Sequence, residues 1–138
     1  MSTPRWQKFE RCNSLAYLTS LMLRKAMAVR ADVQGHFDPA VVRIVVYETG
    51  RSIERQAYLV HKGSSKTMHS RHLNGEACDL VPYVLVHGRW QPTWDDLRGR
   101  DGRSVWQLIK ASAAAHGLET ISWDGPHIQL PANAPAEG

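Results

Sequence analysis

The chain has 138 residues, the length of one ordinary domain, which leaves too little sequence for two independent hydrophobic cores. Apolar residues make up 43% and charged residues 22%, values typical of a globular protein, so an intrinsically disordered chain is excluded. No apolar run is long enough to span a membrane. The two cysteines, Cys12 and Cys78, cannot form a disulfide framework or a four-cysteine zinc site.

The chain is basic, with 17 Lys and Arg residues against 13 Asp and Glu residues and a formal net charge of +4. Such a surface favours anionic partners, namely nucleic acid, anionic lipid or an acidic cell-wall polymer, without choosing among them. Histidine, a common metal ligand and acid–base group, occurs seven times. The first residues contain no apolar signal region, so we expect synthesis in a cytoplasm without an export signal.

The first predicted element is an amphipathic helix within an N-terminal helical segment, residues 1–34. Its apolar residues recur at steps of three or four and are expected to face the core: Leu15, Leu18, Met22, Ala26 and Val29. A run of β-branched residues then predicts a strand at 41–47. Ser52 is expected to cap a short helix over residues 53–61.

Residues 77–86 predict a second strand, in which Pro82 suggests a sheet edge or a break. The polar stretch 87–103 predicts a surface excursion with a short helical turn near residues 94–97. Trp90 and Trp94 in this stretch are expected either to anchor the loop or to line a substrate groove.

The last predicted helix begins after Ser104, a good N-cap, and ends at Gly117. Its buried face is expected to consist of Val105, Leu108, Ile109 and Ala113. Two short strands, 118–123 and 128–130, follow and are separated by a tight turn at 124–126. With residues 131–138 as a flexible tail, these elements predict a single α+β domain over the whole chain.

Two segments, 70–79 and 122–127, contain the residues that point to chemistry. A catalytic zinc takes three protein ligands and leaves a fourth position for water, and His72, Asp79 and His127 would supply that set. Asp124 precedes His127 by three residues and could take a proton from water at the metal and pass it to a leaving amine. For any single histidine a structural or surface role is more common. The prediction of a metal site therefore depends on the two segments taken together.

The joint pattern resembles a known family. The run from His72 through Gly75 and Ala77 to Asp79 looks like the His-x-x-Gly-x-Ala-x-Asp signature of zinc D-alanyl-D-alanine carboxypeptidases, which include phage L-alanyl-D-glutamate endopeptidases. Trp-Asp-Gly-Pro-His, ending at His127, resembles the second signature, in which the acidic residue is the catalytic base. The resemblance therefore implies zinc binding by His72, Asp79 and His127 and a catalytic role for Asp124.

A third match lies upstream, where Arg51-Ser-x-x-x-Gln56 resembles the family stretch whose arginine stabilises the oxyanion of the scissile carbonyl. The resemblance assigns this role to Arg51, with Arg55 as the alternative, and implies substrate-binding roles for Ser70 and Gln56. The chain departs from the family pattern at Gly50, where an aromatic residue is common, and at Cys78, where an aliphatic one is. If Asp79 faces the metal, strand alternation turns Cys78 into the core as a buried thiol.

The resemblance implies a hedgehog/D,D-peptidase-like α+β fold, in which a small antiparallel sheet has flanking helices. It implies an endopeptidase with one Zn²⁺ per chain that cleaves peptidoglycan stem peptides, most simply a phage or prophage endolysin with L-alanyl-D-glutamate specificity. Such an enzyme is expected to be a monomer in the host cytoplasm, without stable membrane insertion, and to act in the periplasm or cell wall after a holin opens the membrane.

Three other functions stay open. The chain could be a D,D- or L,D-carboxypeptidase that trims stem peptides, or a non-catalytic module that binds metal and wall polymer. The presence of both Asp124 and Arg51 argues against a pure binder. Nucleic-acid binding rests on charge alone and is not expected, because no helix-turn-helix, zinc-finger or aromatic RNA-binding signature is present. His69 could contact substrate or bind a metal adventitiously, although a histidine in such a place is more often simply exposed.

Overall fold

The computed structural model describes residues 11–65, 70–122 and 124–132. Helical and extended segments alternate along the chain, which confirms the α+β class. The elements in chain order are η1 (Leu15–Tyr17), α2 (Ser20–Gln34), β1 (Val42–Glu48), α3 (Ile53–His61), η2 (Arg71–Asn74), β2 (Ala77–Val86), β3 (Arg89–Pro92), α4 (Val105–Ala115), β4 (Glu119–Ile121) and β5 (Asp124–Gln129). The two η elements are single 3₁₀ turns.

The strands form one antiparallel sheet in the order β1-β2-β5-β4, and β3 pairs with β2 beyond the end of β5. The long strand β2 therefore has β1 along one edge, whereas its other edge is shared by β5 and β3. Asp79 stands opposite His127 in the β2–β5 register and opposite Glu48 in the β2–β1 register. This register brings residues from three distant parts of the sequence to one point of the sheet.

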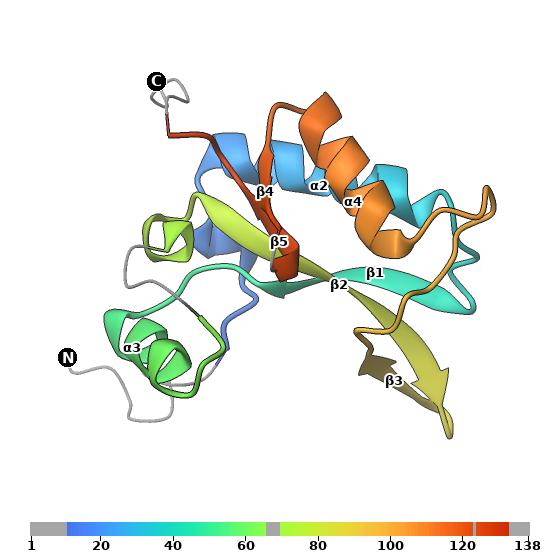
Figure 1. Ribbon diagram of the computed structural model, residues 1–138, viewed down its shortest axis with the longest axis horizontal. Helices are drawn as coiled ribbons and strands as arrows, with labels where there is room; N and C mark the ends of the chain where they lie inside the picture. Colours follow the sequence, from blue (N-terminus) through green and yellow to red (C-terminus); the bar gives the residue numbers. More distant parts are fainter. Residues whose placement is uncertain (1–10, 66–69, 123, 133–138) are drawn as a thin grey trace.

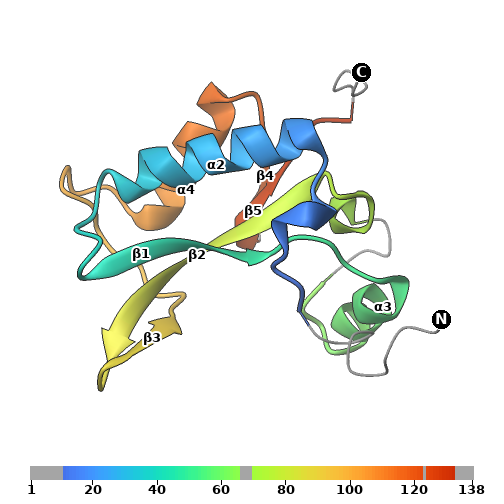
Figure 2. The same cartoon turned by 180° about the vertical axis from the view of Figure 1, so that it is seen from behind.

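Helices α2 and α4 pack side by side on one face of the sheet, whereas α3 lies away from them beyond the other side of the sheet (Figures 1 and 2). The core lies between these two helices and the sheet. Its fully buried side chains include Met22, Val29, Ile44, Leu80, Ile109 and Ile128. Burial of each such aliphatic side chain stabilises the fold by roughly 1.5–3 kcal/mol, so this layer holds the sheet in place.

The N-terminal helix is shorter than the apolar stripe predicts. Thr19 caps α2 by accepting a hydrogen bond from the Met22 amide, so the helix begins only at Ser20. Leu18, just before the cap, is buried, but Leu15 belongs to η1 and is 39% exposed. The expectation that Leu15 faces the core as part of the helix is therefore wrong, because a cap residue interrupts the periodic stripe.

Three predicted elements are confirmed with their boundaries. Helix α3 spans Ile53–His61 behind its Ser52 cap, and β2 spans Ala77–Val86. Ser104 and Gln107 form a capping box at the start of α4, and Gly117 follows the helix in a left-handed conformation.

Pro82 pairs with Ile44 of β1 on one side, but on its other side β2 has no partner strand at this position, so the local edge that the proline suggested is confirmed. Its carbonyl oxygen accepts a hydrogen bond from the Thr93 amide and so faces away from β1. The missing N–H of Pro82 faces the same side, where β5 has ended and β3 has not yet begun. The proline is tolerated because it requires no ladder hydrogen bond there.

Two predictions about the second half are wrong. Residues 94–97 form no helical turn; the polar excursion instead begins with strand β3, which pairs with β2 across a two-residue turn at His87 and Gly88. Both turn residues have positive φ angles, as tight hairpins require. The tight turn expected at 124–126 is also absent, because β5 starts at Asp124 and continues to Gln129.

Several expectations concern residues outside the described ranges: the first ten residues of the N-terminal segment, most of the tail, His69 and Trp123. In the part of the chain that the structure describes, no helix is long and apolar enough to cross a membrane.

Candidate metal centre

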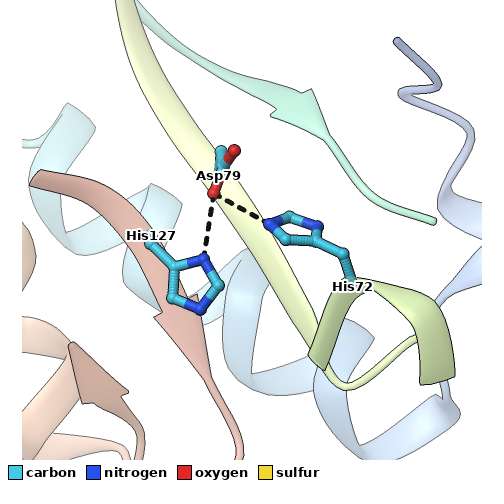
Figure 3. Close-up of side chains that lie close together, drawn as sticks. All are labelled: His72, Asp79 and His127. Carbon is cyan, nitrogen blue, oxygen red and sulfur yellow. Dashed lines mark hydrogen bonds and ion pairs between the residues drawn. The ribbon is translucent and has the colours of Figure 1, made fainter. Parts of the chain in front are cut away.

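His72, Asp79 and His127 converge at one point of the sheet (Figure 3). One potential ligand atom from each lies within 4.8 Å of the others, and all three residues are buried. His72 comes from the 3₁₀ turn η2, Asp79 from β2 and His127 from β5. The structure thus brings together all three residues that the sequence predicts as metal ligands.

Asp79 stands between the two imidazole rings. Its Oδ1 lies 3.1 Å from His72 Nε2 and 3.3 Å from His127 Nδ1. The ring centroids of the two histidines are 5.0 Å apart. Burial alone would raise the pKa of Asp79, but the neighbouring histidines outweigh burial and hold this pKa well below its ordinary value. The Asp79 side chain is therefore a carboxylate.

The remaining nitrogen of each ring has a partner that fixes the tautomer. His72 Nδ1 lies 2.7 Å from the Thr49 carbonyl oxygen, which can only accept, so Nδ1 carries the proton. His127 Nε2 lies 2.8 Å from Gln129 Oε1 and donates to it, while the Gln129 amide nitrogen faces Glu119. Both neutral rings would therefore direct a lone pair at Asp79.

Two imidazole lone pairs and a carboxylate cannot share one buried point unless a cation lies among them. In the protein alone a proton can fill that need in part. Burial by itself would lower the pKa of His127, but its hydrogen bond to Asp79 and the charge of that carboxylate raise it. A divalent metal would satisfy all three groups at once, and a set of two histidines and one carboxylate is a common catalytic zinc site. The donor set therefore fits a metal ion.

Arg51 lies beside the three ligands and is mostly buried. Its Nη2 is 3.8 Å from Asp79 Oδ2, whereas the other carboxylate oxygen, Oδ1, faces the two histidines. Two other contacts hold the guanidinium: Nε donates to Glu48 at 2.7 Å, and Nη1 donates to Gln56 at 2.8 Å. Arg55, the alternative, forms a two-point ion pair with the same Glu48. Of the two arginines, Arg51 is thus the one that the described contacts link to Asp79.

Asp124 begins β5, three residues before His127, and is half-buried. Burial raises its pKa, and the nearby negative charge of Asp79 raises it further. Positive charge on His127, His72 and Arg51 acts in the opposite direction and is weaker. Asp124 therefore sits close enough to the centre to respond to its charge and has an increased affinity for a proton.

The structure gives Ser70 and Gln56 supporting contacts. The Ser70 hydroxyl accepts a hydrogen bond from the His72 amide and caps η2. Gln56 is fully buried, and its amide nitrogen donates to the Ser65 hydroxyl while its oxygen holds Arg51. Substrate contact by these two residues stays a prediction. Cys78 faces the core as expected, and burial raises the pKa of its thiol.

Comparisons with known proteins now identify the family. Residues 37–130, which include all the site residues above, match the family model described as phage L-alanyl-D-glutamate peptidase. The chain belongs to this family. The resemblance to L-alanyl-D-glutamate endopeptidases, read from the sequence motifs, is therefore confirmed.

One sequence relative and one solved structure extend this result. An L-alanyl-D-glutamate peptidase of Listeria phage A118 is 33% identical over 90 residues, which make up 64% of this chain but only 31% of that protein. The crystal structure of the L-Ala D-Glu endopeptidase ChiX of Serratia marcescens matches with a TM-score of 0.56 and 25% identity, covering 88% of this chain and 90% of that one. The second match shows that the fold is that of an endopeptidase of this class.

Three residues that support the centre carry no assigned role in the sequence interpretation: Glu48, Thr49 and Gln129. Glu48 and Gln129 could have been suspected from spacing, since they stand three residues before Arg51 and two after His127. Thr49 acts through its backbone carbonyl, which no side-chain motif can reveal. Such outer contacts orient the ligands of metal sites and tune their basicity.

An N-terminal brace, residues 12–19, precedes the stretch that matches the family and holds two parts of the centre. The Thr49 amide donates to the Cys12 carbonyl at 2.7 Å, and the Thr49 hydroxyl donates to the Ser14 carbonyl at 2.7 Å. The Thr19 amide donates to the Gly75 carbonyl at 3.0 Å, next to the turn that carries His72. The brace therefore fixes both the carbonyl that orients His72 and the turn from which His72 projects.

Proposed function

We propose that this chain is a zinc-dependent endopeptidase that cleaves the L-alanyl-D-glutamate bond of peptidoglycan stem peptides. One observation supports it above the others: two imidazoles of fixed tautomer and one carboxylate converge beside an arginine and a second, proton-binding carboxylate. Membership of the peptidase family supplies the substrate class.

His72, through Nε2, Asp79, through Oδ1, and His127, through Nδ1, would hold the metal. Zinc suits this set because it accepts mixed nitrogen and oxygen ligands in a tetrahedral site with one open position. When bound, zinc would act as a Lewis acid on the scissile carbonyl and would lower the pKa of water at the open position. The Thr49 carbonyl and the Gln129 side-chain oxygen hold the two rings so that His72 Nε2 and His127 Nδ1 would be free to bind the ion.

Asp124 is the proposed acid–base residue. Peptide hydrolysis needs a group that takes a proton from the attacking water and then delivers it to the leaving amine. A carboxylate of ordinary pKa accepts protons poorly, but burial and the charge of Asp79 raise the pKa of Asp124 toward the working range. The raised pKa of Asp124 and its electrostatic coupling to Asp79, His127 and Arg51 support this role.

Arg51 is the proposed electrostatic stabiliser. Attack on the peptide carbonyl places negative charge on its oxygen, and a fixed guanidinium stabilises that charge better than a mobile one. Glu48 and Gln56 anchor the Nε and Nη1 groups of Arg51, so the side chain need not be ordered during the reaction. We propose that Nη2, on the Asp79 side, faces the substrate oxygen.

In its biological setting we propose that the chain is a phage or prophage endolysin. It would accumulate as a monomer in the host cytoplasm and reach the periplasm and cell wall after holin-assisted permeabilisation. The formal charge of +4 would aid its approach to the anionic envelope, although salt screens that attraction.

A lysis assay with control of the metal tests this proposal. Outer-membrane-permeabilised Gram-negative cells should lose turbidity when the protein is added, chelation by EDTA should abolish the loss, and zinc should restore it. Metal analysis of the purified protein should give one zinc per chain. The His72→Ala variant should no longer bind zinc. Undiminished lysis by the fully metal-free protein would overturn the assignment.

A further inference from the structure

One face of the sheet carries partly exposed aromatic side chains that the metal centre does not use. Side chains alternate along a strand, so Asp79, Val81, Tyr83 and Leu85 share one face of β2. The intervening residues Cys78, Leu80 and Val84 pack into the core on the opposite face. Since α2 and α4 cover that opposite face, the face that carries Asp79 lies away from both helices (Figures 1 and 2).

Trp90 belongs to this face, because it pairs with Leu85 in the β2–β3 register, and residues paired across strands point to the same side. The Arg43 guanidinium lies 4.1 Å from the centre of the Trp90 ring. Arg43 itself pairs with Tyr83 in the β1–β2 register. Arg43 therefore reaches across β2 on the outer side of the sheet and stacks on the indole.

Trp94 continues the alternation of β3 two residues beyond Pro92, which pairs with Tyr83. The preceding amide, that of Thr93, donates to the carbonyl of Pro82, three residues after Asp79. The Trp94 ring meets the Tyr47 ring edge to face, with 5.4 Å between centroids, and is 52% exposed. The Arg11 guanidinium covers the Tyr47 ring at 3.8 Å.

These contacts define an aromatic face made of Tyr47, Tyr83, Trp90 and Trp94. It is basic at its edges, because Arg11 and Arg43 stack on two of its rings. Trp94 is exposed and the other three are partly exposed. Accessible aromatic side chains of this kind, apolar in body and polar at one end, are typical of binding surfaces. The face begins beside Asp79, because Tyr47 directly precedes Glu48, the residue that pairs with Asp79 in the β1–β2 register.

The substrate class indicates what binds there. In a peptidoglycan stem, the alanine of the L-alanyl-D-glutamate bond is attached through a lactyl group to the sugar. Alanine and lactyl group together span about two residue lengths, roughly 7 Å, so the glycan must lie that close to the metal centre. Tyr47, at the start of the aromatic face, lies one strand and one residue away from Asp79, roughly 6 Å between backbones, and so within this reach.

Resting on the proposed function, we infer that the aromatic face binds the glycan strand to which the stem peptide is attached. Sugar rings present an apolar face to an aromatic ring and hydroxyl and acetamido oxygens at their rim, which the flanking arginines can bind as donors. The enzyme would then recognise the stem peptide from its sugar end. Binding of the sugar would bring the L-alanyl-D-glutamate bond to the metal.

Two substrates and three variants test the inference. One substrate is a muropeptide with its disaccharide attached, and the other is the same stem peptide without sugar. Trp94→Ala and Trp90→Ala should lower kcat/KM on the glycan-linked substrate by roughly tenfold, mainly through KM, and should change hydrolysis of the free peptide by less than about twofold. Trp94→Phe, which keeps an aromatic ring, should retain most of the wild-type activity on both substrates.

Val86→Ala is the matched control, because Val86 lies on the same hairpin, is 37% exposed and occupies the opposite alternation. Hydrolysis of the free peptide also reports whether each variant is folded. Equal losses on both substrates, or no loss on either, would overturn the inference.

If the proposed endopeptidase function is wrong, wild-type protein should cleave neither substrate, and this outcome differs from every outcome that concerns the aromatic face. Binding of stem-free glycan chains, measured by calorimetry, would still decide the inference: wild type should bind them and Trp94→Ala should bind them more weakly. Equal affinity of the two proteins, or no binding to either, would contradict a glycan-binding face.

Discussion

At the scale of single residues, the centre separates groups that would hold the metal from groups that would act on the substrate. Asp79 is a carboxylate because two imidazoles hold its pKa low, whereas burial and the charge of Asp79 raise the pKa of Asp124. Two nearby carboxyl groups with opposite shifts are a common basis for separate ligand and acid–base roles.

Asp124→Asn tests this separation. The amide is similar in size but cannot accept the proton from water, so kcat/KM should fall by roughly 10²–10⁴-fold. Zinc content should stay at one per chain, because Asp124 is not among the proposed ligands. Asp96→Asn removes an exposed carboxylate on the loop and should leave activity near that of wild type. Retention of full activity by Asp124→Asn would exclude the proposed acid–base role.

Gln129 offers a second test, because its side-chain oxygen fixes the tautomer of His127. Gln129→Leu removes the acceptor and should weaken zinc affinity by roughly 10–100-fold, as measured by competition with a chromogenic chelator. Gln129→Glu keeps an acceptor at the same position and should bind zinc at least as tightly as wild type. Equal affinities in the leucine and glutamate variants would show that this hydrogen bond does not orient the ligand.

The ligand set could be predicted from sequence because two short motifs contain all three residues with their signature spacing. The supporting residues could not. Thr49 contributes a main-chain carbonyl, and its contact with His72 spans 23 positions of the chain. Gln129 becomes a partner of His127 only once β5 is known to extend through both residues.

At the scale of elements, capping residues and residue patterns in the sequence predicted most of the boundaries of helices and strands. These local patterns failed where a segment forms a strand only because it pairs with another strand. Capping serines set the starts of α3 and α4, and their side chains make the expected contacts. Strand β3 escaped prediction because its polar sequence is stabilised by pairing with β2. The predicted turn at Asp124 failed for a similar reason, since pairing with β4 at Ile121 includes that residue in β5.

The N-terminal brace makes a prediction at Gly75, whose φ angle is +70°. A Cβ atom there would overlap the Tyr17 carbonyl oxygen, which is backbone and cannot move aside without displacing the brace. Gly75→Ala should therefore lower the free energy of unfolding by about 2–4 kcal/mol, the sum of left-handed strain and overpacking. Urea denaturation provides the measurement.

Gly102→Ala is the control for strain alone, because Gly102 has a φ angle of +84° and open space around the added atom. It should cost only about 1–2 kcal/mol. If the two variants were equally stable, the brace would not press on the turn that carries His72.

At the scale of the whole molecule, acid should weaken the fold through Glu48, which is 3% exposed and joins β1 to both arginines after it. Burial would raise the pKa of Glu48, but its hydrogen bonds with Arg55 and Arg51 outweigh burial and lower the pKa below its ordinary value of 4.5. A carboxyl with a lowered folded pKa stabilises the fold above its unfolded pKa, and that stability is lost as the pH falls below about 4.5.

Glu48→Gln should therefore flatten the pH dependence of stability in this acidic window, even if it lowers stability overall. Urea unfolding of both proteins in chelator at a series of pH values from about 6 to 3 measures the slopes. An unchanged slope in Glu48→Gln would show that this carboxyl does not contribute to acid sensitivity.

The central claim concerns the bond that the metal centre cleaves, and a digest of purified peptidoglycan analysed by mass spectrometry tests it most directly. The proposed function predicts sugar-linked fragments that end in L-alanine and free peptides that begin with D-glutamate, with both absent when EDTA is present and restored by zinc. Release of D-alanine from the stem termini, or the same products in chelator, would contradict a metal-dependent L-alanyl-D-glutamate endopeptidase.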